Sequence, residues 1–254
     1  MRPHLAAAAA LSFVALSALT PSAHAEGEEA PPHVAVEAAP DVPQPASRPE
    51  VDHYRSFWRF EIGVRSSFVA DPGLDPFAQN DYVPQFSLAA SRTILARDRF
   101  SFAAGLAWDY GSRSEHARGD FASLSIHRLA VPLEGRMHFG PWGYAFVRAA
   151  PGVVTTSVSL EDAAAAATLT KDRALFAADF SAGYALLVHR NGPATKAAPR
   201  VWLQGEGGYG WTARERLDLH PDLADNDPRR AGGVDLGSLA LRGPFFRIAL
   251  AITY

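Results

Sequence analysis

The strict alternation of the last ten residues constrains this chain more than any other feature. Large apolar side chains stand at every second position, and an aromatic residue ends the chain: Phe246, Ile248, Leu250, Ile252 and Tyr254. The intervening positions carry charged, small or polar side chains: Arg247, Ala249, Ala251 and Thr253. A period of two residues is that of a β-strand with one face in an apolar medium. We therefore predict a strand whose other face borders a narrow, partly polar interior.

The same alternation recurs in earlier segments, beginning just after Tyr54. Together with the last segment they make eight predicted strands, at residues 58–68, 82–91, 100–110, 128–139, 145–153, 176–188, 201–211 and 245–254. Each has about the ten residues that a tilted transmembrane strand needs. The links after the second, fourth and sixth strands are short or moderate, whereas those after the first, third, fifth and seventh are longer and polar.

This pattern resembles that of bacterial outer-membrane β-barrels, in which short links lie in the periplasm and long ones outside. The resemblance covers about Tyr54 to Tyr254 and is to the small OmpA/OmpX-like architecture. It implies an all-β fold, an eight-stranded antiparallel up-and-down transmembrane β-barrel that is monomeric in the outer membrane. It also implies two kinds of partner, outer-membrane lipid and the assembly machinery, which would read the alternating residues of the last strand as its signal: Phe246, Ile248, Leu250, Ile252 and Tyr254.

The segment before the barrel is predicted to contain a leader and a tether. Arg2, an apolar stretch over 5–19 and the small-x-small site at 23–25 indicate a signal peptide over residues 1–25. Residues 26–53 are rich in proline and alanine and nearly free of aromatic residues, which predicts a disordered periplasmic tether. The barrel is then expected to span residues 54–254.

Composition excludes several classes of function. The chain has no cysteine, which excludes disulfides, thiolate metal sites and cysteine nucleophiles. A formal net charge of -3 gives no reason to expect a nucleic-acid partner. One acidic stretch has calcium-type ligands, but its spacing matches no calcium loop: Asp218, His220, Asp222, Asp225, Asn226 and Asp227. No cofactor and no metal are therefore predicted.

Charged residues at the inward positions of the predicted strands are expected to fill the lumen. There are six arginines and five carboxylates: Arg59, Arg65, Arg128, Arg136, Arg148, Arg247, Glu61, Asp109, Glu134, Asp179 and Glu206. An eight-stranded barrel is just wide enough for side chains to fill, and buried charges must be paired. We therefore predict a salt-bridge network that plugs the barrel. The alternative is a narrow, porin-like conduit for a small or apolar solute.

A soluble barrel of the lipocalin kind also alternates with a period of two, but its apolar face would point inward. The many glycines, alanines and serines in the mid-strand polar face favour a tight lumen instead. Aromatic residues also gather near the strand ends, as two interfacial girdles would. The first girdle would comprise Trp58, Phe100, Phe139 and Tyr144, and the second Phe68, Tyr82, Tyr110 and Trp211.

Five residues fit this pattern less well. Pro84, Pro132 and Pro151 lie within or beside strands of a barrel that has no free edge, so we expect β-bulges there. Ser125 and His127 share the outward side of the fourth strand, which places that end of the strand above the bilayer.

The sequence favours a structural or surface-interaction role, with passive transport as the alternative and a lipid-modifying hydrolase third. Ser125 and His127 could be a nucleophile and its base, but no carboxylate shares their face to orient the histidine. Their order also departs from the His-x-Ser arrangement of lipid A deacylases. No catalytic residue is predicted.

Overall fold

The computed structural model describes residues 58–117, 120–162, 167–190, 199–221 and 234–254. The predicted leader, the predicted tether and the first residues of the predicted barrel lie outside this range. The described part consists of antiparallel strands and one short 3-10 helix, η1 (Pro72–Leu74). The strands are β1 (Trp58–Phe68), β2 (Tyr82–Arg97), β3 (Phe100–Ala117), β4 (Asp120–Ala130), β5 (Leu133–His138), β6 (Gly143–Asp162), β7 (Ala167–Arg190), β8 (Arg200–Thr212), β9 (Glu215–Pro221), β10 (Val234–Leu239) and β11 (Gly243–Thr253). In the described residues, no helix has both the length and the apolar character to cross a membrane.

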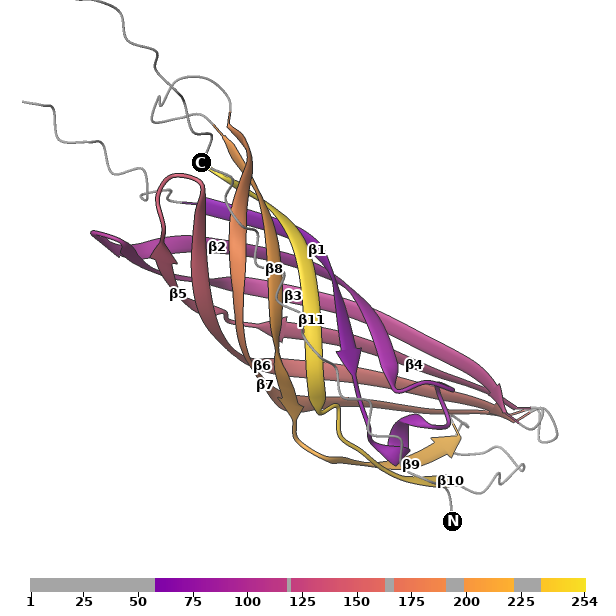
Figure 1. Cartoon of the computed structure of the whole chain (residues 1–254). Helices are drawn as coiled ribbons and strands as arrows, with labels where there is room; N and C mark the ends of the chain where they lie inside the picture. Colours follow the sequence, from indigo (N-terminus) through magenta and orange to yellow (C-terminus); the bar gives the residue numbers. More distant parts are fainter. Residues whose placement is uncertain (1–57, 118–119, 163–166, 191–198, 222–233) are drawn as a thin grey trace, which may run out of the picture. The chain divides into compact units, whose positions relative to one another are not determined.

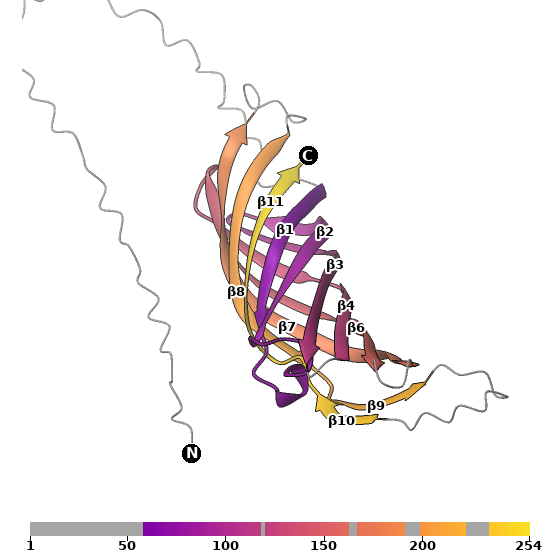
Figure 2. The same ribbon diagram turned by 90° about the vertical axis from the view of Figure 1, so that its right-hand side faces the viewer.

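The strands close into a ring (Figures 1 and 2). Pairing runs from β1 through β2 and β3 to β4 and β5, which lie end to end, and then through β6, β7 and β8 to β11. The last strand pairs with the first, so that Ile62 faces Leu250 and Val64 faces Ile248. We call each position in the ring a stave, whether one strand or two strands lying end to end fill it. Because β4 and β5 together form one stave, the ring has eight staves. The predicted eight-stranded antiparallel barrel is confirmed.

The break between β4 and β5 is caused by proline, without the bulge that we predicted. Ala107 pairs with Ala130 and Ala104 with Leu133, so the register continues unshifted across Pro132. Pro132 and Pro151 cannot donate a backbone hydrogen bond, but the carbonyl oxygen of each still accepts one from the neighbouring strand. The Gly105 N–H donates to the oxygen of Pro132 at 3.1 Å, and the Val131 N–H to that of Pro151 at 2.8 Å. Losing one N–H per proline therefore costs a ladder bond but does not displace the strand.

Pro84 also lies in an unshifted register, opposite Ser66. It stands beyond the last pair of β2 with β3, Phe86–Tyr110, so its missing N–H breaks no bond on that side. The bulges in the ring lie elsewhere, between Thr93 and Leu95 in β2 and between Leu187 and His189 in β7.

The ring turns its apolar face outward. Phe180 is 63% and Leu250 49% exposed, whereas Glu134 is 3% exposed. The exposed belt continues around the staves with Phe60, Ile62, Val64, Leu88, Leu106, Leu129, Val147, Tyr184, Leu203 and Ile248. This is the reverse of a lipocalin-type barrel, and it is the orientation predicted from the sequence.

The strands β3, β4, β6 and β7 run well past the ring, which corrects the prediction of long polar loops at this end. The pairing of β3 with β4 continues to Ala117–Asp120, and that of β6 with β7 to Asp162–Ala167. Figure 1 shows these strands reaching past the ends of β1 and β11. Strand β9 pairs with β7 and β10, so the predicted loop over 212–242 contains a hairpin as well.

In this extension the two faces exchange their character. Serines and threonines point outward on the extended strands: Ser112, Ser114, Ser123, Ser125, Thr155, Ser157 and Ser159. The inward side is instead a hydrophobic core, which we name the distal cap; it comprises Val69, Leu74, Phe77, Val83, Ala122, Leu124, Ile126, Val154, Val158, Leu169, Ala177, Leu217, Leu219 and Leu239. The helix η1 and the β9–β10 hairpin supply part of this core. The extension is thus built like a water-soluble domain, with the apolar side chains inside.

Candidate functional site in the barrel interior

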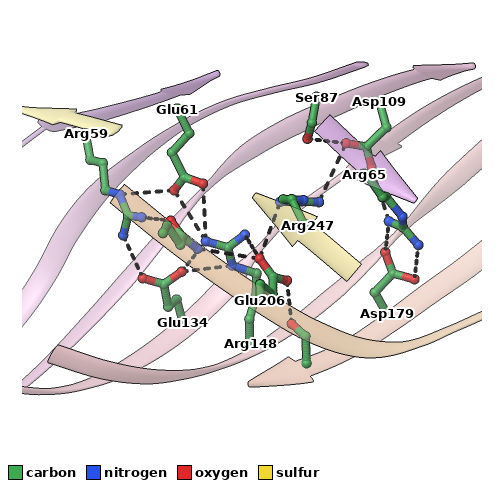
Figure 3. Close-up of polar contacts among 12 residues, drawn as sticks. Arg59, Glu61, Arg65, Ser87, Asp109, Glu134, Arg148, Asp179, Glu206 and Arg247 are labelled. Atoms are coloured by element: carbon green, nitrogen blue, oxygen red, sulfur yellow. Dashed lines mark hydrogen bonds and ion pairs between the residues drawn. The ribbon is translucent and has the colours of Figure 1, made fainter. Parts of the chain in front are cut away.

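All eleven charged residues that the sequence places in the lumen are buried, with exposures between 1% and 6%. Each of them takes part in at least one ion pair. The pairs form two clusters along the lumen (Figure 3). We call the cluster nearer the Tyr254 end of the barrel the proximal cluster and the other the distal cluster.

The proximal cluster contains three arginines and three glutamates: Arg59, Arg136, Arg148, Glu61, Glu134 and Glu206. Glu134 of β5 accepts hydrogen bonds from the Nη1 of Arg59 at 3.1 Å and the Nε of Arg148 at 2.8 Å, and another from Arg136. Arg136 lies on the same strand as Glu134, and Arg148 is the register partner of Glu134 on the adjacent β6. Arg59, in contrast, reaches Glu134 across the narrow lumen from β1, 75 residues away in the chain. The charges in this cluster balance.

Arg148 of β6 joins the proximal cluster across the lumen. Its Nη1 donates to Glu206 of β8 at 2.9 Å, and its Nη2 lies 3.3 Å from an oxygen of Glu61 of β1. With its bonds to Glu134, one guanidinium therefore contacts carboxylates from three other strands. A planar guanidinium with five N–H donors is suited to this role, and a lysine ammonium is not.

The distal cluster contains three arginines and two aspartates: Arg65, Arg128, Arg247, Asp109 and Asp179. The Nη1 of Arg65 lies 2.6 Å from Asp179 and 3.3 Å from Asp109. Arg128 lies 2.7 Å from Asp179.

Arg247 of β11 connects the two clusters. It lies 3.6 Å from Asp109 in the distal cluster and 3.7 Å from Glu206 in the proximal one. Figure 3 shows it between them. Ser87 and Gln204 add hydrogen bonds to Asp109 and Arg59 respectively. The inward positions of Ser87 and Gln204 were evident from the alternation, which is the signal that could have assigned them to the network.

Aromatic side chains close the proximal end of the lumen. Tyr144, Phe146 and Trp202 are buried together, and the Trp202 indole N–H donates to the hydroxyl of Thr253 at 3.0 Å. The guanidinium of Arg59 lies 5.6 Å from the centre of the Tyr144 ring. The predicted place of Tyr144 in the first girdle is therefore wrong. Its position in β6 has the same parity as Phe146, which turns the ring into the lumen.

The other predicted girdle residues lie on the outer surface, exposed or half-buried: Trp58, Phe100 and Phe139 near one end, and Phe68, Tyr82, Tyr110 and Trp211 near the other. In the second girdle the aromatic contacts extend to β4, where the centre of the His127 ring lies 4.8 Å from that of Tyr110 and 6.1 Å from that of Trp108. Ser125 and His127 are on this outer face, as the alternation predicted, and Ser125 pairs with Ser112 and Ser157 on the neighbouring strands.

The predicted acidic stretch is only partly described. Asp222, Asp225, Asn226 and Asp227 lie outside the described residues. Asp218 lies 3.6 Å from Arg216, and Arg216 also contacts Asp235. Bonds from the Gly237 N–H and from Arg216 lower the pKa of Asp235. Within the part of the chain that the structure covers, no three His, Asp or Glu side chains are grouped as metal ligands.

The five residues of the predicted assembly signal all point outward from β11. Tyr254 follows the strand, and its N–H donates to the carbonyl of Trp58 at 3.1 Å, so the last residue is held against the first described one. Both edges of β11 are paired, with β1 and β8, and its outward apolar face is exposed at the barrel surface. Its reading by an assembly machinery stays a prediction.

No protein-family model and no curated protein matches this chain. Solved structures that are similar to it include Neisserial surface protein A (TM-score 0.42, 9% identity, 78% of this chain and 95% of that one). Another is Ail, the attachment invasion locus protein of Yersinia pestis (TM-score 0.44, 8% identity, 79% and 99%). A third is the outer membrane protease OmpT from Escherichia coli (TM-score 0.43, 8% identity, 79% and 98%). Likenesses this distant carry no argument about function. The strand pairing itself gives the chain the small OmpA/OmpX-like barrel architecture.

Proposed function

We propose that this protein is an outer-membrane β-barrel with a structural or surface-interaction role, and that its lumen is closed to solutes. The exposed apolar belt supports the membrane location. Side chains such as Phe180 and Leu250 would be costly in contact with water on every stave, and lipid tails remove that cost. A leader over residues 1–25 would direct export, the tether over 26–53 would lie in the periplasm, and β11 would be read during assembly.

The contacts of Arg148 with three glutamates carry the proposal of a closed lumen. They tie β6 to its paired neighbour β5 and, across the lumen, to β1 and β8. The aromatic residues at the proximal end and the distal cap lie beyond the charge clusters on either side. A solute passing through would have to separate several buried ion pairs and displace two apolar layers.

Planar-bilayer recording tests this against the alternative of a narrow channel. The chain without its leader is refolded into lipid vesicles, and its insertion is verified by flotation and by protease resistance. We expect no discrete conductance steps, because the ion pairs stay formed in the unperturbed barrel. Discrete steps from verified, homogeneous insertions would refute the closed lumen and favour passive transport.

The surface role rests on the extension, which presents a polar sheet on its outer face. The short links between strands lie at the Tyr254 end, so the extension would face outside the cell. Because the chain has no native cysteine, single introduced cysteines can report which side of the membrane the extension faces. Ser157→Cys in the exposed face of the extension should react with a membrane-impermeant maleimide in intact cells. Arg97→Cys, exposed at the opposite end, is the matched control and should react only after permeabilisation. The reverse labelling pattern would overturn the orientation.

The third candidate, a lipid-modifying hydrolase, depends on Ser125 and His127. The neighbours that the structure gives the His127 ring are Trp108 and Tyr110, which are aromatic and not acidic. We therefore place these residues in an interfacial aromatic and polar band. Mass spectrometry of lipid A and phospholipids, with and without the protein, tests this assignment.

A further inference from the structure

The charges of the two lumen clusters are distributed unequally. The proximal cluster has three arginines and three glutamates, whereas the distal cluster has three arginines and two aspartates. Arg247 also lies 3.7 Å from Glu206, but that carboxylate is already paired with Arg148 at 2.9 Å. One positive charge in the distal cluster is therefore left without a carboxylate of its own. A charge in this position is costly unless something compensates it.

Among the described arginines of the distal cluster, Arg247 has one buried nitrogen without a hydrogen-bond partner and Arg128 of β4 has two. Arg128 is buried, with 5% exposure. Its Nε has no hydrogen-bond partner among the described residues, and its Nη2 is close to Asp179 without being aligned to donate. Buried donors of a charged group are rarely left in this state. The side chain lies where the charged lumen gives way to the distal cap, since its neighbour Ile126 already belongs to that core.

A small cavity lies beside this guanidinium. About 20 Å³ of it is open to the centre of a water-sized sphere, which is room for about one water or one halide ion. Two arginines and several neutral donors line it, and its lining contains no carboxylate: Arg65, Ser67, Gln85, Arg128 and Thr212 are the polar residues. Val69, Val83, Ile126 and Val154 close its other sides. Both arginines also contact Asp179, at 2.6 Å from Arg65 and 2.7 Å from Arg128, so one positive charge of the pair is in excess beside a cavity that is rich in donors and walled by apolar groups.

We propose that this cavity binds one small monovalent anion of halide size, held by Arg128 and Arg65 with the amide of Gln85. An anion accepts several hydrogen bonds at once and compensates the additional positive charge, whereas a water molecule would supply only the acceptor. The single positive charge in excess favours a monovalent anion over sulfate or phosphate. Chloride is the physiological ion of this class, and its binding would couple the charged network to the distal cap.

Thermal unfolding in matched salts tests the proposal with the refolded chain in detergent. Sodium chloride is compared with sodium gluconate at equal ionic strength, because gluconate is too large for the cavity, and sodium sulfate is included to measure the general stabilisation that salts of this kind give. We expect the unfolding midpoint to rise by roughly 3 to 6 °C for each tenfold increase in chloride above its dissociation constant. Equal midpoints in chloride and gluconate would overturn the site.

Two variants localise the effect. Gln85→Glu places a carboxylate in the cavity wall and should abolish the chloride dependence while the barrel still folds. Arg128→Leu should do the same, with Arg136→Leu in the proximal cluster as the control for losing a buried arginine. That control should lower the midpoint and keep the chloride dependence. A chloride effect that survives Gln85→Glu would refute the assignment.

A crystal grown in bromide provides a direct readout. We expect an anomalous peak within hydrogen-bond distance of the Arg128 Nε. Density for water alone at that position would refute an anion site, whatever the salt dependence of unfolding.

Discussion

Replacing Glu134 by glutamine removes the carboxylate that three arginines share in the proximal cluster. Arg59 keeps its contact with Glu61, and Arg148 keeps Glu61 and Glu206. Arg136 contacts no other carboxylate among the described residues, so it alone becomes an unpaired buried charge. Leaving one partner of a buried pair uncompensated costs about 3–5 kcal/mol. We therefore expect a loss of about 3–5 kcal/mol in the free energy of unfolding, not three times that amount.

The assay is equilibrium unfolding in urea from lipid vesicles, followed by the fluorescence of the tryptophans. The double variant Glu134→Gln/Arg136→Met is the informative comparison, because it also removes the unpaired charge. It should be more stable than Glu134→Gln alone, with a coupling energy of about 0.5–3 kcal/mol. Strictly additive effects, or a loss below about 1 kcal/mol for the single variant, would refute the reasoning. The single variant should also remain non-conducting, since Arg148 still crosses the lumen. A jump in conductance would favour the channel.

Two further predictions concern the packing of the barrel and of its extension. Gly243→Ala should destabilise the barrel by about 1–3 kcal/mol or more, because a Cβ there would lie 1.8 Å from the carbonyl oxygen of Phe68. Gly207→Ala, which meets no atom within 4 Å, is its control in the same unfolding assay. Leu124→Ala should lower the free energy of unfolding by about 2–5 kcal/mol, since Leu124 is fully buried in the distal cap. Ser125→Ala, the next residue on the outward face, should change it by less than about 0.5 kcal/mol, and equal effects would contradict the inward core.

The period of two was sufficient to predict the ring and its orientation. One face of each strand is apolar over about ten residues, so the inward parity of Glu134, Arg148 and Glu206 followed directly. Their pairing partners did not, because distances across the lumen depend on how the staves are staggered. Arg148 reaches Glu61 from a strand 87 residues away in the chain, and no local pattern encodes that contact.

The extension was missed for a physical reason. Leu124, Ile126, Val154 and Val158 alternate with serine and threonine, but the apolar residues there have the inward parity. If apolar residues are expected only at outward positions, the strand pattern ends at this point and a polar loop is predicted to follow. Tyr144 shows the same limitation at the other end. An aromatic residue near a strand end suggests an interface, while parity alone decides whether it faces lipid or the lumen.

The exchange of faces marks where the surrounding medium changes. The outward pairs of β4 with β6 run from Leu129–Val153 to His127–Thr155 and then to Ser125–Ser157. The inward side changes over the same pairs, from Arg128 to Ile126. Lipid around the ring demands an apolar outside and leaves polar groups to pair within, whereas water around the extension demands a conventional apolar core. On the proposed orientation, the outer boundary of the bilayer therefore lies at the level of His127. Strands that cross it keep one register and one hydrogen-bond ladder, and they exchange only the chemistry of their two faces.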